Sequence, residues 1–188
     1  MLFASGNGTN AENIIKYFKE KKDVIIQEIF TNNPNAGVIQ RAKNLNVPVS
    51  TFNKESFYNK DEVLTRLKQI DPDLIVLAGF LWKVPVKIIE SFNNRIVNIH
   101  PALLPNYGGK GMYGMHVHKA VINSGDRKSG ISIHWVNEEY DKGDIIAQFT
   151  CPVSENDTPE SLAQKVHQLE YSHFPLVIDN ILGNKYKV

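Results

Sequence analysis

The sequence has a single cysteine, Cys151, among its 188 residues, so no disulfide can form within the chain. A metal site built from several cysteines is excluded for the same reason. No apolar run approaches the roughly 20 residues that a transmembrane helix needs, which argues against a membrane span. The first residues also lack a basic segment followed by a long apolar stretch, so we expect no signal peptide and a cytoplasmic protein.

Neither sign of charge is in clear excess, since 21 lysines and arginines face 20 aspartates and glutamates. No strong basic field is therefore expected to recruit nucleic acid. The remaining composition, 42% hydrophobic and 22% charged, is that of an ordinary globular protein. A chain of this length buries a sizeable core without disulfides, and we expect one domain that covers residues 1–188.

Segments with the pattern of a strand alternate with helical segments over the first hundred residues. The predicted strands are 2–5, 24–31, 47–50, 74–78 and 95–99. The predicted helices are 10–20, 36–45, 60–69 and 85–92. This alternation predicts a Rossmann-like α/β fold, in which a mostly parallel sheet carries helices on both faces. Active sites of such sheets lie beyond the carboxyl ends of the strands.

The pattern changes after residue 100. The glycine-rich stretch 107–114 has no periodicity and predicts a mobile loop. A helix is expected over 115–124, and the segments 129–136 and 144–153 predict an antiparallel strand pair. The sequence Thr158-Pro159-Glu160 is typical of a helix start. We expect this long terminal helix to be interrupted or ended by Pro175.

Two polar residues stand at the end of the last parallel strand, in the sequence Asn98-Ile99-His100-Pro101. Alternate residues of a strand point to the same face, so the side chains of Asn98 and His100 aim into one space. Pro101 restricts His100 to an extended backbone. An amide beside an imidazole suits a reaction in which negative charge develops on a carbonyl oxygen. A structural hydrogen-bonding role for His100 is the alternative.

The turn Ser5-Gly6-Asn7-Gly8-Thr9-Asn10 links the first strand to the first helix. Such a turn can point backbone N–H groups at an anion, and the helix dipole assists. It lacks the third glycine of the dinucleotide motif and the lysine of the Walker loop, so neither of those sites fits. A phosphate site and a tight turn capped by asparagine both stay open.

Asp141 lies in the turn-prone sequence Tyr140-Asp141-Lys142-Gly143. An aspartate in a turn usually caps backbone groups. Placed beside His100, however, its carboxylate would favour the protonated imidazole and fix its orientation.

The other histidines are weaker candidates. His134 lies on the polar face of its strand and could line the site. His116 and His118 begin a helix and are predicted to cap it or to lie at the surface. His167 and Glu170 are three residues apart and share one side of the last helix, where a solvated pair is the alternative to a ligand contact.

Four segments resemble those of the folate-dependent formyltransferases in order and approximate spacing. They are Ser5–Asn10, Leu77–Phe80, Asn98–Pro105 and Tyr140–Gly143. The resemblance extends from the first turn to the last helix. It implies one formyltransferase domain with a phosphate- and nucleotide-binding half at 1–100. The half at 101–188 would then carry folate contacts and the catalytic aspartate.

The resemblance also implies roles for individual residues. The residues that match the catalytic group are Asn98, His100 and Asp141. Those that match the contacts to the substrate phosphate and ribose are Gly8, Thr9, Asn10, His167 and Glu170. Those that match the folate contacts are Leu81, Trp82, Lys83, Val84, Asn98, Asn137, Glu138, Glu139, Tyr140 and Asp141. The chain departs from the family at Trp82, where arginine is usual, at His167, and in the longer, glycine-rich segment 107–114.

The implied reaction transfers the formyl group of 10-formyltetrahydrofolate, a co-substrate, to the amine of phosphoribosylglycinamide in purine synthesis. No metal is implied. The implied partners are these small molecules, with neither nucleic acid nor membrane, for a monomer or homodimer. The opening turn resembles the purine enzyme's phosphate loop. We expect neither the extra domain of the tRNA formyltransferase nor that of the formyltetrahydrofolate hydrolase. A hydrolase on the same scaffold and a non-catalytic phosphate-binding module are the alternatives.

Overall fold

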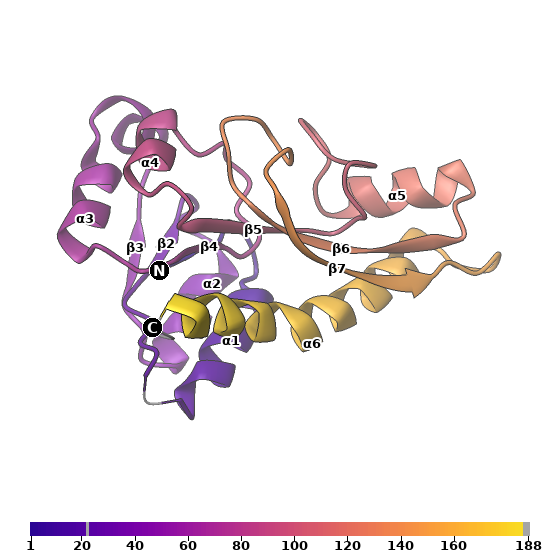
Figure 1. Cartoon of the computed structure of the whole chain (residues 1–188), viewed down its shortest axis with the longest axis horizontal. Helices are drawn as coiled ribbons and strands as arrows, with labels where there is room; N and C mark the ends of the chain where they lie inside the picture. Colours follow the sequence, from indigo (N-terminus) through magenta and orange to yellow (C-terminus); the bar gives the residue numbers. More distant parts are fainter. Residues whose placement is uncertain (22, 186–188) are drawn as a thin grey trace. The chain divides into compact units, whose positions relative to one another are not determined.

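The computed structural model describes residues 1–21 and 23–185. Figure 1 shows strands and helices alternating along the indigo-to-magenta part of the chain. The strands are β1 (Leu2–Phe3), β2 (Ile29–Thr31), β3 (Val49–Thr51), β4 (Ile75–Leu77), β5 (Ile96–His100), β6 (Lys128–Trp135) and β7 (Ile145–Pro152). The helices are α1 (Thr9–Lys19), α2 (Gly37–Asn44), the π-helix η1 (Glu55–Asn59), α3 (Glu62–Ile70), α4 (Val86–Ser91), α5 (Met115–Ser124) and α6 (Pro159–Lys185).

The first compact unit is Met1–Val97. Its strands pair in parallel, β1 with both β2 and β4, and β2 with β3. Helices α1 and α2 lie on one side of these strands and α3 and α4 on the other (Figure 1), as right-handed crossovers require. Every residue of β4 is buried, as expected for a strand covered on both faces.

The second unit is Asn98–Val188, described as far as residue 185. Its main feature is the antiparallel pair of β6 and β7, in which Ile131 lies opposite Phe149. The register shifts between Ile133 and His134. Helix α6 packs against both strands and against α5. Leu162, Val166 and Phe174 form the buried side of α6.

The strand order is β3-β2-β1-β4-β5-β6-β7 in a seven-stranded sheet. A mostly parallel sheet, a terminal antiparallel pair and a long last helix confirm the predicted fold class. The assignment of phosphate and nucleotide binding to residues 1–100, and of the folate contacts and the catalytic aspartate to residues 101–188, stays a prediction. None of the helices in the described part of the chain is long and apolar enough to cross a membrane.

Two sequence-based boundaries were wrong, and one element was missed. Strand β2 begins at Ile29 rather than at residue 24, and Ile25 is 72% exposed, so the apolar pattern there is not buried in the sheet. Helix α6 continues through Pro175, although proline removes one helical hydrogen bond. Phe174 and Val177, on either side of Pro175 in the helix, are buried, so tertiary packing stabilises the helix at this position. The π-helix η1 was not predicted.

Candidate active site

The end of β5 presents Asn98 and His100 as the sequence predicted. Asn98 is half-buried and His100 is buried. The turn that follows is tied to β6 by Ser132, whose hydroxyl accepts the Leu104 N–H at 2.9 Å and donates to the Ala102 carbonyl at 2.7 Å. These bonds fix the chain as it leaves the strand, so the position of His100 is set by backbone rather than by a free loop.

His134 links the polar groups of the site. Its Nδ1 lies 2.8 Å from the Trp135 carbonyl, which can only accept, so Nδ1 carries the proton in a singly protonated ring. Nε2 then accepts a hydrogen bond from the Asn98 amide at 3.1 Å. Because an amide nitrogen carries two hydrogens, Asn98 keeps one for another acceptor.

Asp141 lies beside both histidines. Its Oδ2 is 3.5 Å from His100 Nδ1 and accepts the Gly109 N–H at 2.8 Å, and its Oδ1 is 3.6 Å from His134 Nε2. Burial raises the pKa of Asp141, but the neighbouring His134 and His100 and the Gly109 N–H together lower it by more. The net pKa lies below the usual value, and the carboxylate is ionised at neutral pH.

His100 has acceptors at both ring nitrogens. Its Nε2–H donates to the Tyr107 carbonyl at 2.8 Å, while Nδ1 faces Asp141. Only the doubly protonated ring can donate to both. Burial nevertheless lowers the pKa of His100 by more than Asp141 and the Tyr107 carbonyl raise it. Asp141 favours the protonated imidazole, as the sequence predicted, but burial outweighs this attraction and the pKa of His100 lies below its usual value.

The turn at residues 5–10 is held by backbone geometry in the first unit. Gly8 has φ +72°, and a Cβ there would lie 2.4 Å from Val38 Cγ2. Helix α1 starts just after it, with the Glu12 N–H bonded to the Gly8 carbonyl at 2.9 Å. Arg41 donates to the Asn7 carbonyl at 2.8 Å and pairs with Glu12. The first N–H groups of α1 lack helical acceptors, as a phosphate site requires.

Comparison with known proteins places this chain in a family. The family described as formyl transferase matches residues 1–178. The chain belongs to the formyl transferase family. A phosphoribosylglycinamide formyltransferase from Bacillus subtilis is 34% identical over 97% of this chain and 93% of its own length. A chloroplastic phosphoribosylglycinamide formyltransferase from Arabidopsis thaliana is 40% identical over 99% of this chain, which spans 66% of that relative's length.

A solved formyl transferase structure has the same fold. It is the phosphoribosylglycinamide formyltransferase from Bacillus halodurans, which aligns with a TM-score of 0.89 and 33% identity, covering 100% of this chain and 96% of that chain.

The ribose and phosphate residues predicted on α6 form a pair. His167 Nδ1 donates to the Glu170 carboxylate at 2.9 Å, which raises the pKa of His167. The alternative of a solvated pair holds for His167, which is exposed, but not for Glu170, which is buried. His118 lies nearby, its ring centroid 6.4 Å from that of His167. Within residues 1–21 and 23–185, no group of three or more histidines, cysteines, aspartates or glutamates is arranged to hold a metal ion.

His118 is not a surface group, which corrects the sequence-based expectation. It is 1% exposed, and burial lowers its pKa to about 4. Its Nδ1 is buried without a hydrogen-bond partner. The sequence did not predict this burial. His118 lies only two residues after the exposed His116, but on the side of α5 that faces the protein interior.

The residues matched to folate contacts fall into two groups. In the first unit, Leu81 is 50% exposed, Val84 is buried, and the Lys83 carbonyl accepts the Tyr58 hydroxyl at 3.0 Å. Trp82 packs against three aromatic rings, those of Phe52, Phe57 and Tyr58. In the second unit, the residues before Asp141 are all exposed: Asn137, Glu138, Glu139 and Tyr140. Their folate contacts stay predictions.

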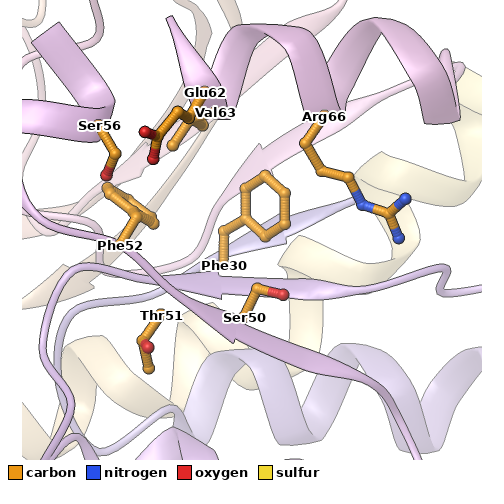
Figure 2. A pocket seen from close by; sticks show the side chains of 8 residues that line it. All are labelled: Phe30, Ser50, Thr51, Phe52, Ser56, Glu62, Val63 and Arg66. Atoms are coloured by element: carbon orange, nitrogen blue, oxygen red, sulfur yellow. The ribbon is translucent and has the colours of Figure 1, made fainter. Parts of the chain in front are cut away.

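A separate pocket lies beside β3 and holds none of the predicted residues. The side chains that line it are shown in Figure 2. Its volume is about 180 Å³. Its lining consists of Phe30, Ser50, Thr51, Phe52, Ser56, Glu62, Val63 and Arg66. Arg66 and Ser50 are both bonded to the buried Glu28. The pocket contains no histidine or amide, so the acyl chemistry expected of a formyl transferase lies elsewhere.

Sequence reasoning named His134 only as a candidate and missed Tyr107 and Gly109. The backbone of these two residues contacts His100 and Asp141, and a backbone contact leaves no side-chain signal in the sequence. Alternation along β6 did place His134 on the same face as Ser132, which is the face that carries the polar contacts.

Proposed function

We propose that this chain transfers the formyl group of 10-formyltetrahydrofolate to the amine of phosphoribosylglycinamide. The observation that carries the proposal is the group of Asn98, His100 and Asp141, in which Asp141 lies 3.5 Å from His100 and 3.6 Å from His134, and His134 lies 3.1 Å from Asn98. Relatives that bear the name of this activity match nearly the whole chain. The small-molecule substrates, the named donor and a cytoplasmic location belong to the same proposal.

The first step is attack of the substrate amine on the formyl carbon. A carbon–nitrogen bond forms and the carbonyl electron pair moves to oxygen, which becomes negative. The free N–H of Asn98 donates a hydrogen bond to this oxygen, and so does His100 Nδ1 once the ring is protonated, because Nε2–H stays bonded to the Tyr107 carbonyl. Negative charge beside His100 raises the affinity of its ring for a proton, so the imidazole takes up a proton from water as the intermediate forms and returns it to water when the carbonyl forms again.

The second step removes a proton from the attacking nitrogen. Asp141 is ionised and can accept that proton, directly or through water. When the oxygen electron pair returns to the carbon, the bond to the folate nitrogen breaks, and that nitrogen takes up the proton that Asp141 received, directly or through water, which regenerates the carboxylate. The products are the formylated amide and tetrahydrofolate. The substrate amine is the nucleophile, so no covalent enzyme intermediate is needed.

The substrate contacts follow from the resemblance. We propose that Gly8, Thr9 and Asn10 bind the phosphate, and that Glu170 and His167 contact the ribose side. The backbone N–H groups that start α1 support the first assignment, and the buried carboxylate of Glu170 supports the second. Binding energy from the phosphate then serves to position the amine.

Steady-state kinetics with both substrates test this proposal. In Asn98→Ala and Asp141→Asn, we expect kcat to fall by about 10²–10³, with smaller changes in KM. The matched control is Asp144→Asn, because Asp144 is exposed and lies three residues after Asp141. It should keep wild-type kcat. Full turnover in both site variants would overturn the assigned roles.

A further inference from the structure

The glycine-rich segment after β5 touches both catalytic side chains through its backbone. The Tyr107 carbonyl accepts the His100 Nε2–H at 2.8 Å. Two residues later, the Gly109 N–H donates to Asp141 Oδ2 at 2.8 Å. The same carboxylate oxygen faces His100 Nδ1. The path of residues 107–109 therefore sets the orientation of the imidazole and of the carboxylate together.

This segment lies tightly against the site. A Cβ on Gly108 would come within 2.6 Å of Leu104 Cδ2 and 3.3 Å of Asp141 Cβ. Tyr107 itself has φ +56°, a left-handed conformation that costs energy for a residue with a side chain. Such a conformation persists only where the surroundings hold it.

The Tyr107 side chain supplies that hold. Its hydroxyl donates to the Asp126 carboxylate and shares a hydrogen bond with Ser124 Oγ at 2.6 Å. Ser124 ends α5, and Asp126 lies in the turn that leads to β6. Burial and the neighbouring Asp126 raise the pKa of the Tyr107 phenol, so it stays a donor at neutral pH.

We propose that Tyr107 is a positioning residue, anchored on Asp126 and Ser124 so that the backbone of residues 107–109 holds His100 and Asp141 in their reactive orientation. The proposal rests on the proposed function for its catalytic meaning. It assigns a role to residues 107–109, for which the resemblance implied none. It also predicts a change at His100 that is measurable without any substrate.

The groups that face His100 define this readout. Asp141 and Glu170 raise its pKa, His134 lowers it, and the Tyr107 carbonyl raises it. Tyr107→Phe changes none of these charged groups, but it frees the backbone of residues 107–109, which holds both the acceptor for His100 Nε2 and the N–H that binds Asp141. Losing a well-directed acceptor at Nε2 lowers the pKa of His100 further below that of the wild type.

The test combines NMR titration of the His100 ring with steady-state kinetics on Tyr107→Phe. We expect a lower His100 pKa and a kcat lower by about tenfold, with KM for both substrates within about twofold. The matched control is Tyr113→Phe in the same segment, since Tyr113 is 48% exposed and packs against His116. It should match the wild type in both measurements.

A second experiment compares Asp126→Asn with the double variant that combines it with Tyr107→Phe. Both single changes break one shared interaction, so the double variant should lose no more activity than the more affected single variant. Wild-type kcat and wild-type His100 titration in Tyr107→Phe would overturn the proposal. A fall in kcat with an unmoved His100 pKa, or fully additive losses, would also overturn it. If the wild-type protein fails to transfer formyl groups, the proposed function fails, while the titration still tests the positioning.

Discussion

Among single residues, His134 sets the orientation of the Asn98 amide. The imidazole takes one of the two amide hydrogens of Asn98 and so orients the other. His134 is 2% exposed, and its Nδ1 is committed to the Trp135 carbonyl. The ring therefore cannot turn without losing both bonds, and it acts on the reaction through Asn98 and Asp141.

Replacing His134 by alanine should lower kcat by about tenfold and leave KM for both substrates nearly unchanged. The reason is that Asn98 loses the acceptor that fixes its amide plane. Steady-state kinetics measure the effect, with the exposed His116→Ala as the control. Equal kcat in His134→Ala and the wild type would show that Asn98 needs no such support.

The buried His118 makes stability depend on pH. Its pKa falls from 6.5 in the unfolded chain to about 4 in the folded protein. Between these values the unfolded chain binds more protons, so the free energy of unfolding decreases as pH falls from 6.5 to 4. His167 acts in the opposite direction, because its raised pKa gives stability that is lost as pH rises through the folded value.

Urea unfolding at several pH values checks this prediction. The His118→Asn variant should show a pH dependence that is flatter by up to about 3 kcal/mol between pH 6.5 and pH 4. His116→Asn, two residues away and exposed, should behave as the wild type. Parallel curves for wild type and His118→Asn would contradict the assignment of this proton uptake.

At the scale of the elements, the turn between β1 and α1 depends on one glycine. Gly8 combines a left-handed backbone with contact against Val38, whereas Gly6 has no atom within 4 Å of its absent Cβ. The two glycines belong to the same turn and provide a matched pair.

Gly8→Ala should lower the free energy of unfolding by about 1–3 kcal/mol, because the added methyl strains the backbone and overlaps Val38. Gly6→Ala should cost well under about 1 kcal/mol. The same strain should raise KM for phosphoribosylglycinamide in Gly8→Ala alone. Denaturant titrations and kinetics measure both quantities. Similar losses in the two variants would argue against a specific requirement at Gly8.

The order of the elements and part of the site could be predicted from the sequence. Periodicity predicted the order of strands and helices, because each buries a local apolar pattern. The motif at residues 98–105 placed Asn98 and His100, since a strand end and a proline are both local signals. The contact between His100 and Asp141 could be expected only from the family resemblance, because a turn 41 residues away has no local link to β5.

Other features depend on tertiary packing that no local pattern records. The register shift at Ile133 and His134 occurs within the β6 and β7 pair, just where His134 contacts Asn98. The burial of His118 and the passage of α6 through Pro175 depend on neighbouring elements. The lowered pKa of His100 likewise follows from its depth of burial, which a sequence does not show.

At the scale of the whole molecule, all the groups proposed to act on the formyl carbon come from the second unit. Asn98, His100, His134 and Asp141 belong to residues 98–141, and their mutual distances are fixed within that unit. The first unit contributes the turn at residues 5–10, proposed to bind phosphate. The chemistry and the phosphate contact are thus proposed for different parts of the chain.

The most direct test follows the fate of a formyl group labelled with ¹³C in 10-formyltetrahydrofolate. With phosphoribosylglycinamide present, we predict that the wild-type protein moves the label into the amide of the formylated product, one label for each tetrahydrofolate released. Without the amine, we predict negligible release of labelled formate. Labelled formate as the main product under both conditions would contradict the account and indicate hydrolysis. Retention of the label on the folate would contradict any acyl chemistry at this site.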